Sequence, residues 1–200
     1  MNELKIDWKK ERPTDRQIID LWQSIRFVPL NNFSDAAKTF MSSVELTHAN
    51  GGIQIHKFKV KSNSHFDWFS SRNRLEEIKF VQKAVRHIDF KDYRKNLKIT
   101  KDKPKVDLIH YWTDIYDIPS IIARTLAVGG AYKKINAQEA WRIGVEFVKE
   151  EFENRFDEFL VYQYAIPSAN WFYDVAWDFS ILIFDIKKNE VFLIDITDTD

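Results

Sequence analysis

The 200-residue chain has no cysteine, which excludes a disulfide framework, a zinc site built on thiolates and a cysteine nucleophile. Glycine and proline are scarce, with five of each, and 44% of the residues are hydrophobic, so the chain is not of low complexity. No apolar run approaches the roughly 18 residues that span a bilayer, and the charged N-terminal stretch does not resemble a secretory signal. We therefore expect one folded, cytoplasmic domain over residues 1–200, without a membrane segment.

Charge is balanced overall but unevenly spread along the chain. Residues 51–105 hold 15 Lys and Arg against 6 Asp and Glu, whereas residues 106–200 hold 8 against 17. The two halves can neutralise each other across the fold, or each can offer a surface to a partner of opposite charge.

Apolar periodicity and capping residues predict helices in four main places. The first helix runs from about Thr14 to Ile25, and Gln17 completes a capping box with Thr14. The others cover about 34–46, 73–88 and 136–156, and a short helix near 119–127 ends at Gly129. In the helix over 136–156 we expect Trp141, Val145, Val148 and Phe152 to face the core.

Alternating apolar residues predict strands over about 52–60 and 106–112, the first with a bulge near His56 where the alternation changes phase. A C-terminal meander follows, with strands over about 159–166, 173–186 and 191–197 and a tight turn over 187–190. The predicted fold class is α+β, an antiparallel sheet with this three-strand meander, packed by four to five helices.

The segment 91–105 is strongly basic and carries little apolar pattern, which predicts a flexible connection or a binding loop. It contains seven cationic residues: Lys91, Arg94, Lys95, Lys98, Lys101, Lys103 and Lys105. Nucleic acid is an alternative partner for these charges, but Tyr93 is the one aromatic residue available there for base stacking.

The sequence contains no phosphate-binding loop, metalloprotease His pair, nucleophile elbow or dinucleotide fingerprint. The five His are too widely spaced for two imidazoles to share a metal on one helix. We expect no cofactor and assign no catalytic residue, which favours a non-catalytic protein.

Acidic residues gather in the last strands and leave one catalytic alternative open. Asp178, Asp185 and Asp195 could hold a metal ion in a nuclease or phosphoesterase, since Asp185-Ile186-Lys187 matches an Asp-x-Lys pattern. Asp195 interrupts an apolar run and shares parity with Val191 and Leu193. An inward carboxylate there needs a partner, so Asp195 is either functional or lies at a sheet edge reached by water.

The sequence offers two groups of residues for binding a protein partner. Aromatic side chains combine a large apolar area with a polar edge, and lysines attract an acidic surface. The candidate partner-binding residues are Trp68, Lys95, Lys98, Trp171 and Tyr173.

Several features occur in a recognisable order: a helix ending in a proline-containing turn (Thr14–Pro29), a second helix, Asn50-Gly51-Gly52 leading into a strand, and a final hairpin over 180–195 with an acid after its last strand. This order resembles the SUKH superfamily of bacterial immunity proteins, although residues 61–158 have no counterpart in it. The resemblance implies an antitoxin-type protein that neutralises a cognate toxin by contact, without catalysis.

Overall fold

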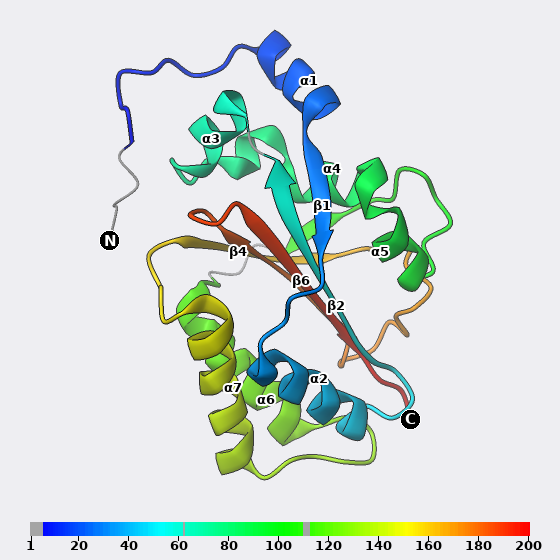
Figure 1. The fold of residues 1–200 in the computed structure, drawn as a ribbon. Coiled ribbons are helices and arrows are strands. Elements are labelled where there is room, and N and C mark those ends of the chain that lie inside the picture. The colour runs from blue at the N-terminus through cyan, green and yellow to red at the C-terminus, as the bar shows by residue number, and fades with distance from the viewer. Residues whose placement is uncertain (1–5, 62, 110–112) are drawn as a thin grey trace.

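The computed structural model describes residues 6–61, 63–109 and 113–200, and within these ranges the chain forms a mixed α and β fold (Figure 1). Six strands make one antiparallel sheet in the order β1-β2-β6-β5-β4-β3. The strands are β1 (Arg26–Leu30), β2 (Gly52–Lys61), β3 (Asp107–Ile109), β4 (Phe159–Ala165), β5 (Phe179–Asp185) and β6 (Glu190–Thr197).

Two groups of helices cover the two faces of the sheet, as Figure 1 shows. The first face is covered by α1 (Asp15–Ser24), α3 (Ser64–Ser70), α4 (Phe80–Arg86) and α5 (Lys91–Asn96), together with short 3-10 helices at Leu75–Ile78 and Ile88–Phe90. The second face is covered by α2 (Asp35–Thr47), α6 (Ile118–Val128) and α7 (Ala137–Phe152), with a 3-10 helix at Ile115–Asp117. The molecule therefore has three layers and a hydrophobic core on each side of the sheet.

The central strands are apolar at nearly every position because both of their faces are covered. In β6, Val191 and Leu193 lie in the first core, whereas Phe192, Ile194 and Ile196 lie in the second. The phase change in β2 has the same cause, and the prediction of a bulge near His56 was wrong. Pairing between β2 and β6 runs without interruption from Gly52 to Lys59.

Local sequence signals located several elements well. Thr14 caps α1 through the expected capping box with Gln17, and Ser34 and Asn136 cap α2 and α7. The turn between β5 and β6 lies where it was expected, with Asn189 at a positive φ of 47°. β5 itself begins at Phe179, six residues later than the predicted strand. Of the predicted strand over 106–112, the structure describes β3, while His110 and Trp112 lie outside the described residues.

The helix predicted over 73–88 is broken, because Lys79 takes a left-handed conformation with φ of 53° between the 3-10 turn and α4. Residues 64–70, for which the sequence predicted neither a helix nor a strand, form α3, whose Phe66 and Phe69 are fully buried. Part of the basic segment is also ordered: Lys91–Asn96 form α5, and Tyr93 and Leu97 are buried in the first core.

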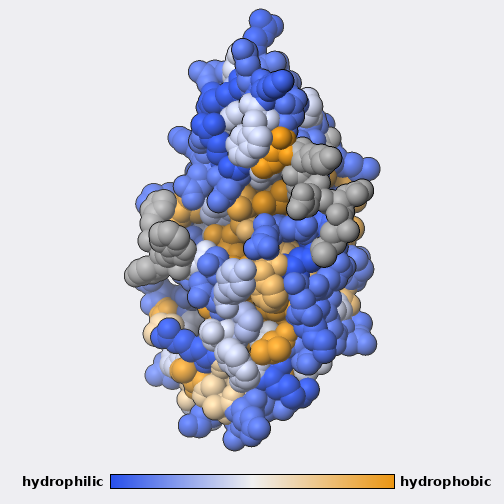
Figure 2. All heavy atoms as spheres, turned by 90° about the vertical axis from the view of Figure 1, so that its left-hand side faces the viewer, coloured by the Kyte–Doolittle hydropathy of each residue, from blue (hydrophilic) through white to orange (hydrophobic). Residues whose placement is uncertain are grey.

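The outer face of α7 departs from the prediction that Trp141 packs on the sheet. Val148 and Phe152 are buried, but Trp141 and Val145 are 51% and 38% exposed. Figure 2 shows that hydrophobic side chains on this side of the molecule form patches bordered by hydrophilic ones. Among the described residues, no helix combines the length and hydrophobicity that crossing a bilayer requires.

Candidate functional site

A buried carboxylate lies at one end of the first face of the sheet. Strand pairing sets Asp195 of β6 between Gln54 of β2 and Ser180 of β5. Asp195 is fully buried, and its Oδ1 accepts hydrogen bonds from Ser180 Oγ at 2.6 Å, Tyr164 Oη at 3.2 Å and Tyr93 Oη at 3.4 Å. The prediction that this residue points inward is correct, and the alternative of a sheet edge is wrong because β6 is a central strand.

The second carboxylate oxygen of this residue, Asp195 Oδ2, is buried and has no hydrogen-bond partner among the described atoms. Burial raises the pKa of the Asp195 carboxyl to about 7, although the hydroxyls of Ser180, Tyr164 and Tyr93 act in the opposite direction. Near neutral pH this group therefore exchanges between a neutral acid and a buried carboxylate.

Two tyrosines connect this carboxyl to its surroundings. The hydroxyls of Tyr93 and Tyr164 lie 2.7 Å apart, and burial together with Asp195 raises the pKa of both well above the ordinary value for tyrosine. On the far side of Tyr93 lies the ring of His56, at 5.2 Å between centroids. Burial lowers the pKa of His56 to about 4, so this imidazole is neutral at pH 7.

The three carboxylates of the nuclease alternative do not converge. Asp185 lies at the opposite end of β5 from Ser180, about 17 Å away at the usual rise per strand residue. There it accepts hydrogen bonds from Nη1 (at 3.1 Å) and Nη2 of Arg155 and from the backbone amide of Lys188 at 2.7 Å. Asp178 accepts from the Val175 amide and the Thr197 hydroxyl. Nowhere in the described part of the chain do three His, Asp or Glu side chains gather as metal ligands would.

Four of the five candidate partner-binding residues lie at one end of the molecule. The backbone amide of Trp171 donates to the carbonyl of Leu97 at 3.2 Å, and Ile99 bridges Ala169. The segment after α5 therefore lies along the loop between β4 and β5. We call Lys95, Lys98, Trp171 and Tyr173 the lysine–aromatic surface.

The side chains of this surface differ in how freely they can meet a partner. Lys95 and Lys98 are exposed, and none of the ion pairs found in the described ranges involves them. Tyr173 is 48% exposed and donates through its hydroxyl to the carbonyl of Asn50 at 3.0 Å. Trp171 is half-buried and packs against the first core.

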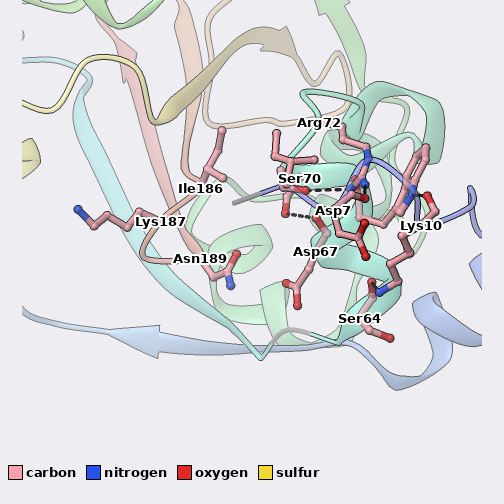
Figure 3. A pocket seen from close by; sticks show the side chains of 12 residues that line it. Asp7, Lys10, Ser64, Asp67, Ser70, Arg72, Ile186, Lys187 and Asn189 are labelled. Atoms are coloured by element: carbon pink, nitrogen blue, oxygen red, sulfur yellow. Dashed lines mark hydrogen bonds between the residues drawn. The ribbon is translucent and has the colours of Figure 1, made fainter. Parts of the chain in front are cut away.

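Trp68, the fifth candidate, lies in α3 and is only 5% exposed. Its indole N–H donates to the Lys10 carbonyl at 2.8 Å, and the guanidinium groups of Arg72 and Arg74 lie 4.7 and 4.9 Å from its ring. This tryptophan lines a cleft between α3 and the turn joining β5 to β6 (Figure 3). In that view Lys187 points away from the α3 residues. Trp68 thus holds the N-terminal segment against α3 and is separate from the lysine–aromatic surface.

A second cleft, of about 490 Å³, opens where β4 ends and β5 begins. Tyr164 and Ser180, whose hydroxyls bond Asp195, belong to its lining. The loop over 166–178 borders this cleft and is held by Trp177, whose indole donates to the Gly129 carbonyl at 3.0 Å.

Sequence reasoning singled out Asp195 but not the hydroxyls that surround it. Ser180 could have been found from strand register, because it pairs directly with Asp195 once the turn over 187–190 is fixed. Tyr93 comes from α5, far away in the sequence, and no local pattern indicates that contact.

Comparison of the sequence with models of known protein families finds no match, and comparison with curated proteins finds no relative.

Proposed function

We propose that this chain is a non-catalytic protein-binding module that docks its partner on the lysine–aromatic surface. The observation that carries the proposal is the pairing of the Leu97 and Trp171 backbones, which brings two exposed lysines beside a tryptophan and a tyrosine. Interfaces are enriched in Trp and Tyr, and exposed lysines that take part in no ion pair with the described residues favour a partner that presents carboxylates.

A protein fits this surface better than a nucleic acid does. Binding of single strands relies on exposed aromatic rings beside the basic groups. In the basic segment the available ring is that of Tyr93, which is completely buried and bonded to Tyr164. Trp171 is half-buried, and the hydroxyl of Tyr173 is engaged by Asn50. The lysines can still attract an acidic protein over a distance.

The resemblance to bacterial immunity proteins supports a finer proposal, in which the partner is a toxin whose working surface this module covers. Such a role requires contact and exclusion only, so it needs no catalytic group on the present chain.

The experiment measures how fast the wild type and three variants associate with, and dissociate from, the partner that the wild-type chain captures. Lys95→Glu/Lys98→Glu reverses two charges on the surface, and Lys9→Glu/Arg16→Glu makes the same charge change at exposed positions near α1. We expect the first variant to associate about tenfold more slowly, with a difference that shrinks at high salt, and the second to associate as the wild type does. Trp171→Ala should speed dissociation instead.

Equal losses in the two charge-reversal variants would show that net charge, and not this surface, directs binding. Sub-micromolar binding of the wild type to short oligonucleotides at physiological salt would contradict a protein partner.

A further inference from the structure

The cleft at the junction of β4 and β5 has the size and composition of a small-molecule site. Its volume of about 490 Å³ falls within the usual range of roughly 300–1,000 Å³ for such sites. One part of its lining is apolar and comes from β3, the 166–178 loop and the start of β5. These residues include Ile109, Ile166, Phe172 and Phe179.

Charge in this cleft is of one sign. Asp174 and Asp178 belong to the lining, and none of the described lining residues is Lys, Arg or His. Neither carboxylate takes part in an ion pair found in the described part of the chain. Asp178 accepts two hydrogen bonds, from the Val175 amide at 3.1 Å and from the Thr197 hydroxyl, which hold the carboxylate in place without neutralising it.

Two residues of the lining, Ser180 and Tyr164, are bonded through their hydroxyls to the buried Asp195. Ser180 directs its hydrogen to Asp195 Oδ1 at 2.6 Å, and Tyr164 directs its own to the same atom at 3.2 Å. These hydroxyls are buried together with Asp195, so the carboxylates of Asp174 and Asp178 are the charged groups that the described lining offers to a ligand.

We propose that this cleft binds a small organic cation, an ammonium or guanidinium group on an apolar body. The cation's N–H groups would meet Asp174 and Asp178, while its apolar body lies against Phe172 and Phe179. Charge complementarity selects the sign, because the described residues of the lining supply two carboxylates and no Lys, Arg or His. The site goes beyond the proposed protein-binding function, since it does not include Lys95 or Lys98.

Three probes of similar size test the proposal: phenethylammonium, the neutral 2-phenylethanol and the anionic 3-phenylpropanoate. Titration calorimetry at pH 7, with amide chemical shifts to locate the site, should show the cation binding about tenfold more tightly than the alcohol and the anion more weakly than either. The shifted amides should belong to residues 163–180.

Two aspartates provide the matched variants. Asp174 is exposed and lies at a φ of 61°, a conformation that asparagine adopts readily, so Asp174→Asn should fold as the wild type does. Asp174→Asn/Asp178→Asn should lose the preference for the cation over the alcohol. Asp20→Asn, at an exposed position on α1, should keep it. A melting curve verifies that each variant is folded before it is titrated.

Equal binding of all three probes would show that the cleft binds apolar groups without regard to charge, and it would overturn the proposal. Failure of all three probes to bind would overturn it as well. Unchanged cation affinity in the folded Asp174→Asn and double variants would assign the binding to another place and also overturn it. These outcomes are independent of the lysine–aromatic surface, which the charge-reversal variants at Lys95 and Lys98 test separately.

Discussion

Ser180 and Asp195 face each other across the β5–β6 pair, and the 2.6 Å hydrogen bond between their side chains is buried in the first core. The other cross-strand pairs from Phe179 to Phe184 are apolar, so this pair places a titratable group where water does not reach. Three hydroxyls donate to one carboxylate oxygen, and the other oxygen has no hydrogen-bond partner among the described atoms. The core on this side is therefore sensitive to the protonation of a single residue.

Asp195→Asn should remove a pH dependence of stability. The folded-state pKa of about 7 lies above the ordinary 3.8, so between these values the folded protein holds a proton that the unfolded chain has released. The free energy of unfolding then falls as pH rises through this window, by up to about 1.4 kcal/mol per pH unit. Asparagine stays neutral. We expect wild type and variant to be similarly stable near pH 4 and the variant to be more stable at pH 8, as measured by urea denaturation.

Three histidines change the pH dependence of the free energy of unfolding in the opposite direction, so their contribution must be separated from that of Asp195. Burial lowers the pKa of His48, His56 and His87, so each contributes stability that increases as pH rises towards 6.5. Subtracting the variant's curve from that of the wild type cancels the histidines. A difference that does not change between pH 4 and pH 8 would contradict a raised pKa for Asp195.

The sequence predicted those elements whose signals are local. Capping residues located α1, α2 and α7, and the Asn-Gly-Gly turn preceded β2, because caps and turns depend on a few neighbouring residues. The burial of β2 and β5 on both faces was harder to predict from the sequence, since a sheet covered on both faces loses the alternation that identifies a strand.

The errors have the same physical origin in tertiary packing. Trp141 lies on α7 at a position where a wide apolar stripe could include it, but the buried apolar stripe of this helix is narrower and consists of Ala140, Ile143, Phe147, Val148 and Phe152. Tyr93 belongs to the segment predicted as a flexible connection or a binding loop, and it is instead the buried link between α5 and Asp195. Such contacts depend on where distant segments meet.

Lys57→Met should be strongly destabilising because it breaks a buried ion pair on the second face. Lys57 Nζ lies 2.6 Å from Glu151 Oε1 and 3.5 Å from Glu190, and both Lys57 and Glu151 are buried. The other oxygen of Glu151 accepts from the Ser34 amide at the start of α2. Loss of the lysine leaves Glu151 without its closest counter-charge, at a cost of about 3–5 kcal/mol in the free energy of unfolding.

The double variant Lys57→Met/Glu151→Gln should regain much of this loss, since glutamine carries no charge and can still accept from Ser34. Lys38→Met is the matched control. Its ion pair with Asp35 spans a similar 2.8 Å but is exposed to solvent, so its removal should leave the free energy of unfolding nearly unchanged. Equal losses in Lys57→Met and Lys38→Met would contradict the role of burial.

Gly144→Ala should destabilise the contact between α6 and α7 even though alanine favours helices. A Cβ on Gly144 would lie 2.4 Å from the carbonyl oxygen of Pro119, in the first turn of α6, and backbone cannot rotate away as a side chain can. In an open helix this substitution gains about 1 kcal/mol. Here we expect a net loss of about 1–3 kcal/mol, because two packed helices must separate to admit one methyl group. Urea denaturation of Gly144→Ala measures this loss, and Val145→Ala, a change on the exposed side of the same helix, is the control. A Gly144→Ala protein more stable than the wild type would show that α6 and α7 are not closely packed at this point.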